Sequence, residues 1–439
     1  MKQSLLYISY YFPPIHSIAS IRNAHLVEEL RAYFSQIDVI TTDNYQLFPI
    51  DEYPLTDVNI HAVATLDYRT FMSRRSKHKV TIHHGESVKN NAIVSSLIKL
   101  NDTFPFSLLL GEGGLRYIYN AYRKASSIIN NADKKTEITI FSSYRSTANI
   151  VVAYLLKKNF PSVRWVNNFH DVPISYSDRP SILHRMEAKN WKRLLEKSTL
   201  NIAVSDGVAK ELDKLNPRIL SIPNGITVSS STASNNHIFT IAYTGSLYGD
   251  RRDPRFLFEV LSTMIQEGLL TLSNFQLIYA GKDGSKWDIF LNEFLALHKL
   301  SRNLGNISRA EVNHIQSSAH INLLLTWSTL NEKGILTGKL YEYLGVRNPI
   351  LAIVNGDQDE EINEIFNRLS CGQALYTSDN QLQSKIYQFI SNQLSFFNNQ
   401  QHILSLTPTE ELDKLTWAAQ VRKLMEHSLM TRTPNNTKA

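Results

Sequence analysis

Short apolar runs alternate with helical patterns along the first half of the chain. The runs are continuously apolar, which is typical of parallel strands that are buried on both faces. Helical patterns over Ser20–Tyr33 and Thr147–Lys158 separate several of them, so we predict a doubly wound α/β domain. The strand-like runs are Leu5–Ser9, Ile37–Thr41, Val58–Val63, Ile138–Ser142, Trp165–Asn168, Leu200–Val204 and Ile219–Ile222.

A polar tract over Ser229–Asn236 interrupts this pattern, which then starts again. Such a tract is typical of a linker. The second series of strand-like runs covers Phe239–Tyr243, Phe275–Ala280, Asn303–Ile307, Ile321–Leu325 and Ile350–Ile353. Helical patterns lie between them at about 254–266, 286–298, 309–318 and 338–345. The sequence therefore predicts two doubly wound, Rossmann-like domains.

The predicted boundaries follow from these two series. We predict a first domain over 1–228, a linker over 229–238 and a second domain over 239–408. A last helical pattern, which Thr409 is suited to cap, covers 409–430, and a tail follows over 431–439.

Composition and charge narrow the function classes. The 439 residues are 43% hydrophobic and 20% charged, which is typical of a globular protein with two domains. The only cysteine, Cys371, is expected in the core. The first residues do not resemble a signal peptide and no apolar stretch nears about 18 residues, so we expect a cytoplasmic protein.

The net charge of +6 is concentrated in part in a basic stretch over 69–79. Two interpretations stay open: a solvated loop, or a contact with anionic lipid at the inner face of the cell membrane. The apolar stretch Phe104–Leu110 is open in the same way, either as core or as a membrane contact. No nucleic-acid-binding motif accompanies the charge, so we expect no nucleic-acid partner.

Several well-known motifs are absent. The sequence has no GxGxxG after the first strand, no P-loop, no HExxH, no CxxC and no GxSxG. These absences argue against a dinucleotide site, a P-loop enzyme, a zinc site and a hydrolase nucleophile elbow. An acidic DxD at Asp357–Asp359 is better explained as the start of a helix, where carboxylates are favoured, and we predict no metal site.

The strongest candidate site follows the run Phe239–Tyr243. Gly245 and Ser246 begin a loop that contains Arg251 and Arg252 and leads into a helix. Ligands of open α/β sheets bind at the carboxyl ends of strands. A glycine there permits close approach, and an arginine can neutralise a diphosphate. A solvated basic turn is the alternative.

A second candidate site is the helix that begins near Gly338. Lys339 and Glu342 lie three residues apart, on the face opposite the buried residues. The N-terminus of a helix and a lysine favour phosphate, and a carboxylate can accept two hydrogen bonds from a ribose diol. A surface ion pair is the alternative.

The first half offers weaker candidates. His170 follows the run Trp165–Asn168, where it could meet a sugar or an acceptor, or be satisfied by Asp171. Ser20 and Arg22 lie at the start of the first helix, where Arg22 could meet an anionic group of the donor or the acceptor.

Taken in order, these motifs resemble the family-4 retaining glycosyltransferases, which have the GT-B fold and act in bacterial polysaccharide synthesis. The resemblance covers nearly the whole chain. It rests on Tyr11-Phe12-Pro13-Pro14, Val204-Ser205, Ile222-Pro223-Asn224-Gly225-Ile226, Thr244-Gly245-Ser246-Leu247, Ala280-Gly281, Gly305-Asn306-Ile307 and Lys339-Leu340-Tyr341-Glu342-Tyr343-Leu344.

The resemblance implies two Rossmann-like domains that face a cleft, with the last helix crossing back to the first domain. It implies a nucleotide-diphosphate sugar as co-substrate, retention of configuration, and neither cofactor nor metal. Loop residues 245–252 and Lys339 correspond to the family's diphosphate contacts, and Asn306 to the residues beside the base. Glu342 corresponds to the ribose-binding glutamate and His170 to the cleft histidine. The acceptor would be a glycan or a polyprenyl-linked glycan bound to the first domain.

Two departures from the family pattern matter. Gly334 occupies the position of the glutamate that contacts the donor sugar, so either Glu332 replaces it or sugar recognition differs. Ala19 and Ser20 stand where the family has a glycine pair. Two other functions stay open: a nucleotide-sugar epimerase on the same fold, and a non-catalytic scaffold with a degenerate site.

Overall fold

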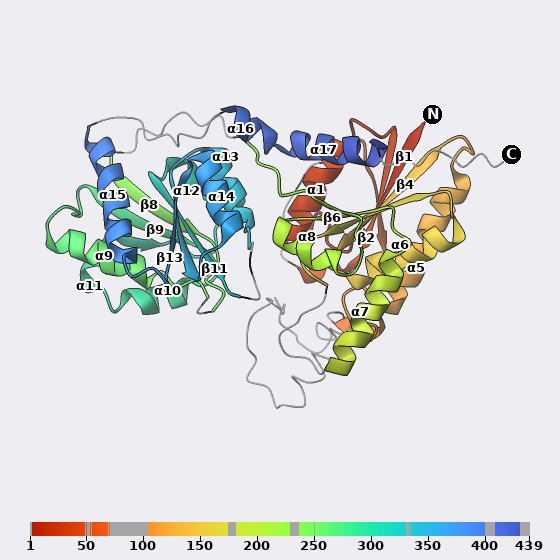
Figure 1. Cartoon of the computed structure of the whole chain (residues 1–439), viewed down its shortest axis with the longest axis horizontal. Coiled ribbons are helices and arrows are strands. Elements are labelled where there is room, and N and C mark those ends of the chain that lie inside the picture. The colour runs from red at the N-terminus through yellow and green to blue at the C-terminus, as the bar shows by residue number, and fades with distance from the viewer. Residues whose placement is uncertain are drawn as a thin grey trace. The chain divides into compact units, whose positions relative to one another are not determined.

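The computed structural model describes residues 2–48, 50, 53, 55–68, 70, 104–173, 181–228, 237–249, 251–330, 333, 335–399 and 409–430. The chain divides into two compact units. Unit 1 consists of Met1–Pro223 and Gln420–Ala439, and unit 2 consists of Asn224–Ala419. Each unit is built on one parallel sheet (Figure 1).

The sheet of unit 1 has seven strands within the described residues, in the order β3-β2-β1-β4-β5-β6-β7. All of its pairings are parallel, so the carboxyl ends of its strands share one edge. The strand order reverses direction between β1 and β4, which makes this the topological switch point of the sheet. The strands are β1 Gln3–Ile8, β2 Gln36–Thr42, β3 Asn59–Val63, β4 Glu137–Tyr144, β5 Arg164–Phe169, β6 Leu200–Ala203 and β7 Ile219–Ser221.

Helices cover both faces of this sheet. One face carries a core to which α5, α6 and α7 contribute Tyr117, Val152 and Trp191. The other face carries α1 and α17, where the Tyr7 hydroxyl of β1 donates to Asn23 of α1 (Figure 1). The helices of unit 1 are α1 Ile18–Leu30, the 3-10 helix η1 Asn44–Leu47, α4 Ser107–Leu110, α5 Gly114–Asn131, α6 Thr147–Asn159, α7 Ser181–Leu195, α8 Asp206–Asp213 and, from Gln420 on, α17 Trp417–Met430.

The sheet of unit 2 has six strands within the described residues, in the order β10-β9-β8-β11-β12-β13. These strands are also parallel, and the switch point lies between β8 and β11. The strands are β8 Phe239–Thr244, β9 Phe275–Ala280, β10 Ser301–Asn303, β11 Ile321–Ser328, β12 Ile350–Gly356 and β13 Gly372–Tyr376.

Strand β11 shows why a continuous apolar run is needed in this sheet. Leu323 and Leu325 face the core under α9, α10 and α15, while Leu324 between them faces the core under α13 and α14. The helices of unit 2 are α9 Arg255–Gln266, α10 Gly284–Leu291, α11 Leu295–His298, α12 Arg309–Ser318, α13 Gly338–Val346, α14 Glu360–Leu369, α15 Leu382–Asn398 and α16 Thr409–Lys414, with the first turn of α17.

The predicted α/β class with two doubly wound domains is confirmed, and α17 begins in unit 2 and continues into unit 1. The last helical pattern is two helices, however. The Ile226 N–H donates to the Leu415 carbonyl at 2.9 Å, and the Thr416 hydroxyl accepts from the Ala419 N–H at 3.3 Å. The chain therefore leaves α16 and starts a new helix.

Two strands of unit 2 differ from the predicted ones. The strand predicted over Asn303–Ile307 ends at Asn303, because Gly305 has φ of 64° and turns the chain. Strand β13 was not predicted, since it is a short edge strand. Cys371, just before β13, is buried as expected, and burial raises the pKa of its thiol to about 12.

The basic side chains of the 69–79 stretch, the polar tract 229–236 and the tail 431–439 lie outside the described residues. Among the residues that the structure describes, no helix combines the length and the apolar character that a bilayer span requires.

Candidate functional site

The candidate residues of unit 2 gather at the carboxyl edge of its sheet. Gly245 and Ser246 follow β8 directly, Asn306 follows β10, and Gly338 begins α13 after β11. Because β8 and β11 flank the switch point, the loop after β8 lies where open α/β sheets bind ligands. Asn306 is exposed in the loop between β10 and α12.

Backbone packing fixes the loop after β8. The Gly245 N–H donates to the Ala280 carbonyl at 2.9 Å. A Cβ at Gly281 would lie 2.1 Å from the Gly245 oxygen, so only glycine fits at 281. A Cβ at Gly245 itself would meet nothing nearer than 3.4 Å. The glycine that the loop requires for close packing is therefore Gly281, while a Cβ at Gly245 would make only ordinary van der Waals contact with Tyr243.

The two arginines of this loop have different surroundings. Arg251 is exposed, and its guanidinium carbon lies 5.1 Å from the ring centre of Trp327. Arg252 is only 8% exposed; it stacks at 4.5 Å on Tyr248 and donates to the Ser246 carbonyl at 3.0 Å. Its Nε is buried and has no hydrogen-bond partner among the described residues. Arg252 thus braces the loop, and Arg251 presents charge outward.

A hydrogen-bonded group joins α13 to the end of β8. The Lys339 ammonium donates to Glu342 Oε2 at 2.7 Å. The buried Gln316 amide donates to the same oxygen and to the Thr244 hydroxyl, both at 2.8 Å. The Thr244 hydroxyl also lies 3.1 Å from the Tyr343 hydroxyl. Gln316 therefore fixes the Glu342 carboxylate relative to the strand end that begins the loop.

Electrostatics keep Glu342 ionised. Its side chain is about one third exposed. Partial burial acts to raise its pKa, but the charge and hydrogen bond of Lys339, the hydrogen bond of Gln316 and the charge of Arg309 together lower the pKa below the usual value. The carboxylate is thus an acceptor at neutral pH.

The start of α13 adds donors to this group. Gly338 is its first residue, and the first N–H groups of a helix have no partner within the helix. Thr337 precedes it without a side-chain cap, and its buried hydroxyl has no partner among the described residues. Two residues of the preceding loop lie outside the described residues. They are Gly334, at the position of the family's sugar-contacting glutamate, and Glu332, its candidate replacement.

In unit 1, His170 follows β5 and belongs to a polar network. Its Nε2 lies 2.8 Å from the Ser143 hydroxyl and 3.3 Å from the Asn168 amide nitrogen. Burial, and then the charges of Arg22 and Arg145, hold the pKa of His170 well below its usual value. The imidazole is therefore neutral at physiological pH.

Ser20 and Arg22 of α1 are buried. Arg22 is 2% exposed and donates to the Ile222 carbonyl at 2.7 Å and to Asn168 at 3.3 Å. The Ser20 N–H donates to the Ser17 hydroxyl, which caps the helix. Arg22 therefore packs at the carboxyl end of β5, while Ser20 lies in the capped first turn of α1.

The DxD at 357–359 has the structural role that the sequence suggested. Asp359 caps α14, where its carboxylate accepts from the N–H groups of Glu361 and Ile362 at 3.1 and 3.2 Å. Among the described residues, no group of three or more His, Cys, Asp or Glu side chains is placed to hold a metal ion.

The sequence analysis did not single out several residues of these edges. Trp327 and Gln316 lacked a local signal, since their partners Arg251 and Glu342 are 76 and 26 residues away. Glu112 of unit 1 did have a local signal. The run Gly111-Glu112-Gly113-Gly114 has three glycines in four residues, which indicates a tight turn.

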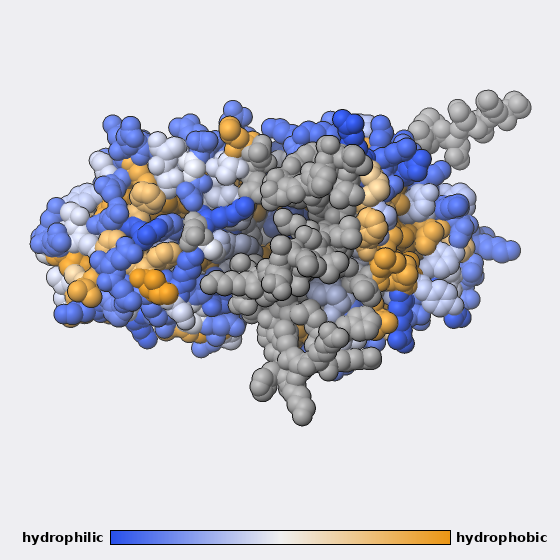
Figure 2. Space-filling model, turned by 90° about the horizontal axis from the view of Figure 1, so that it is seen from below, coloured by the Kyte–Doolittle hydropathy of each residue, from blue (hydrophilic) through white to orange (hydrophobic). Residues whose placement is uncertain are grey.

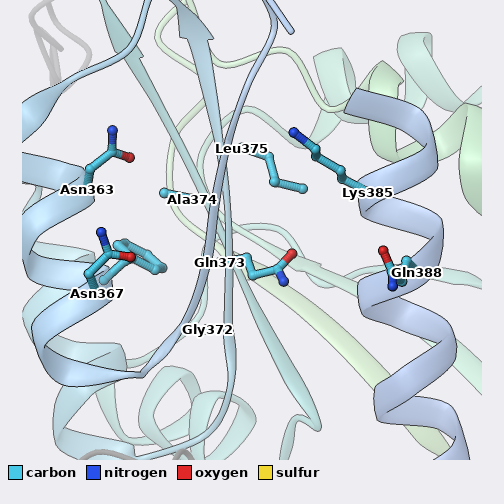
Figure 3. Close-up of a pocket in the computed structure, with 9 residues that line it drawn as sticks. Asn363, Asn367, Gly372, Gln373, Ala374, Leu375, Lys385 and Gln388 are labelled. Atoms are coloured by element: carbon cyan, nitrogen blue, oxygen red, sulfur yellow. The ribbon is translucent and has the colours of Figure 1, made fainter. Parts of the chain in front are cut away.

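A cavity of about 300 Å³ lies elsewhere, along the open edge of β13 (Figure 3). Asn363 and Asn367 of α14 flank it on one side, and Lys385 and Gln388 of α15 on the other. None of the candidate residues lines this cavity.

Two doubly wound units, each with polar side chains at its switch point, define the GT-B class of fold. The chain is similar to solved proteins of this class. The apo form of the lipopolysaccharide outer core galactosyltransferase WaaB shares 10% identity over 98% of this chain and 100% of its own, with a TM-score of 0.54. The trehalose-6-phosphate synthase OtsA shares 11% identity over 98% and 100%, with a TM-score of 0.53. A putative UDP-N-acetylglucosamine 2-epimerase from Listeria monocytogenes shares 11% identity over the full length of both chains, with a TM-score of 0.52. These similarities establish the GT-B fold. No protein-family model and no curated protein sequence matches the chain.

Proposed function

We propose that the protein is a glycosyltransferase that takes a sugar from a nucleotide-diphosphate donor and transfers it to a glycan or a lipid-linked glycan. The observation that carries the proposal is the Lys339–Glu342–Gln316 group beside the loop after β8. It combines a cation, an ionised carboxylate and the start of a helix at one switch point, which suits a nucleoside diphosphate.

In this proposal the leaving diphosphate is stabilised by Arg251, Lys339 and the first N–H groups of α13. The Glu342 carboxylate accepts from the ribose hydroxyls, and Asn306 lies beside the base. Arg252 holds the loop in place through Ser246 and Tyr248. Retention of configuration and independence of metal rest on the resemblance to family-4 glycosyltransferases.

The acceptor side belongs to unit 1, where we propose that an anionic lipid surface contacts α4 and α5. Phe106, Leu109, Leu115 and Tyr119 are all exposed there, and hydrophobic residues gather on the unit 1 side of the view in Figure 2. Helix α5 has three basic residues and no acidic one, so its charge complements such a surface. A lipid-linked acceptor would be reached from this location.

A thermal-shift panel tests the donor site. The purified full-length protein is heated with UDP, GDP, ADP and TDP and with their sugars. Ligands that bind only the folded state raise its melting temperature. We expect one nucleoside diphosphate to stabilise the wild type and not Glu342→Ala. The proposal is wrong if no diphosphate stabilises the wild type, and the scaffold alternative then gains.

The reaction products distinguish a glycosyltransferase from a nucleotide-sugar epimerase. A glycosyltransferase releases the nucleoside diphosphate from its sugar donor. A nucleotide-sugar epimerase returns an intact, epimerised nucleotide sugar, which NMR of the product distinguishes.

A further inference from the structure

The switch point of unit 1 carries a group of side chains that the proposed donor site does not use. Tyr11 follows β1, and Arg145 follows β4, the two strands between which the strand order reverses. Glu112 lies in the turn between α4 and α5, and its carboxylate accepts a hydrogen bond from the Tyr11 hydroxyl. Asp171 lies two residues beyond the end of β5, the next strand.

The turn that carries Glu112 is fixed by its glycines. Gly113 and Gly114 have φ of 96° and 60°, and a Cβ at Gly114 would lie 2.5 Å from the Leu66 carbonyl oxygen. The Glu112 carbonyl accepts from the Ser146 hydroxyl at 2.5 Å. The backbone of Glu112 is therefore held against the residues that follow β4, and from there its side chain reaches Tyr11.

Arg145 follows β4 directly and precedes Ser146, whose hydroxyl holds the Glu112 carbonyl. Tyr144 pairs with Phe169, so Arg145 and Asp171 leave neighbouring strands at the same edge of the sheet. Partial desolvation acts to lower the pKa of the Arg145 guanidinium, but the charges of Glu112 and then Asp171 outweigh that effect and raise the pKa. The charged groups that act on Arg145 are thus two negative carboxylates. His170, which follows β5, is neutral and adds no positive charge.

This arrangement suits a ligand with many hydroxyl groups and no charge. A carboxylate can accept about four hydrogen bonds and a guanidinium offers five donors. The pair can therefore accept hydrogen bonds from vicinal hydroxyl groups and also donate to them. Among the described residues, a phosphate beside Arg145 would meet the carboxylates of Glu112 and Asp171. The other nearby cation, Arg22, is buried and donates to Asn168 and the Ile222 carbonyl, so a phosphate is disfavoured.

We propose that Glu112 and Arg145 form a binding site for the uncharged sugar ring of the acceptor. The inference rests on the proposed glycosyltransferase function and adds the acceptor's chemical class: a neutral glycosyl residue rather than a sugar phosphate or an acidic sugar.

Saturation-transfer difference NMR on the full-length protein tests the site. The probes are the methyl glycosides of glucose, galactose, mannose and N-acetylglucosamine, beside glucose 6-phosphate and methyl glucuronide. We expect at least one neutral glycoside to bind the wild type. Glu112→Gln and Arg145→Gln should each weaken that binding at least fivefold, and the two anionic probes should bind more weakly than the neutral one.

Two variants serve as controls. Glu137→Gln makes the same change at the amino end of β4, away from the proposed site at the carboxyl edge of the sheet. There Glu137 pairs with Arg164, and the variant should bind the glycoside as the wild type does. Glu342→Ala should also retain binding, which would show that the sugar does not bind at the Glu342 site of unit 2.

Three results overturn the inference: no glycoside binds the wild type, both unit 1 variants bind normally, or the anionic probes bind best. Nucleoside diphosphate binding is measured separately by thermal shift. If only this inference fails, the wild type and Glu112→Gln still bind the nucleoside diphosphate. If the wild type binds no nucleoside diphosphate, the proposed function itself is refuted.

Discussion

The Lys339 ammonium lies 2.7 Å from Glu342 Oε2, one turn further along α13. Both side chains are about 30% exposed, so this ion pair contributes only about 0.2–0.5 kcal/mol to stability. A pair with so little structural value is well suited to hold a ligand, since its members can exchange one partner for another at small cost.

Lys339→Ala should therefore separate stability from binding. We expect the free energy of unfolding to fall by less than about 1 kcal/mol, because the pair is partly exposed. Nucleoside diphosphate affinity should fall at least tenfold, since a phosphate loses its cation. Urea denaturation and calorimetric titration measure the two effects. Lys414→Ala removes an ion pair of the same spacing, to Glu411 on α16, and should change neither. Equal affinity in Lys339→Ala and Lys414→Ala would contradict the donor site.

The two arginines of the loop after β8 should respond oppositely. Arg252→Ala should cost about 1–3 kcal/mol of stability, because it removes a buried side chain that stacks on Tyr248 and bonds the Ser246 carbonyl. Arg251→Ala, at an exposed position, should stay within about 0.5 kcal/mol of the wild type and still lose at least tenfold in diphosphate affinity. Urea denaturation beside nucleotide titration checks both. A stable Arg252→Ala protein would show that Arg252 does not brace the loop.

Gly281 and Gly245 provide a matched pair of alanine substitutions. The added Cβ at Gly281 would lie 2.1 Å from a backbone oxygen, so Gly281→Ala should destabilise unit 2 by about 2 kcal/mol or more. The added Cβ of Gly245→Ala would only make van der Waals contact with Tyr243, at 3.4 Å, and should leave the melting temperature nearly unchanged. If the diphosphate lies against Gly245, this variant should still bind it more weakly. Normal affinity in Gly245→Ala would move the diphosphate away from that residue.

The exposed apolar residues of α4 and α5 predict lipid binding. The wild type should sediment with phosphatidylglycerol vesicles and much less with phosphatidylcholine vesicles, and high salt should weaken the binding. Leu115→Ser with Tyr119→Ser should reduce the bound fraction several-fold without loss of stability, since both side chains are exposed. Leu272→Ser with Leu295→Ser, at exposed positions of unit 2, is the control. Unchanged sedimentation of the α5 variant would refute the lipid contact.

Periodicity predicted both sheets because buried parallel strands have continuous apolar runs. It failed where local geometry decides. Gly305 ends β10 early through its positive φ, and β13 is an edge strand whose exposed positions dilute the pattern. The break between α16 and α17 depends on Ile226, nearly 190 residues upstream of its partner Leu415. No window of local sequence contains that bond.

The candidate site was predictable only in part, for the same reason. The glycine, the arginines and the Lys339–Glu342 spacing are local signals. The burial of Arg252 was not predictable, because one aromatic neighbour, Tyr248, lies in the same loop and the other, Trp327, lies near the end of β11, far along the sequence. Nor could sequence show that Gln316 joins Glu342 to Thr244.

Helix α17 has a consequence for how the chain is made. Unit 1 is discontinuous, because its last piece starts at Gln420, after all of unit 2. Leu424 and Met425 lie beside Phe34 and Phe141 of unit 1, and the Lys423 ammonium donates to the Ser221 carbonyl. These residues are synthesised after all of unit 2, so the apolar face that they cover in unit 1 stays exposed while unit 2 is being made. A chain that stops before Gln420 would lack the segment that completes unit 1.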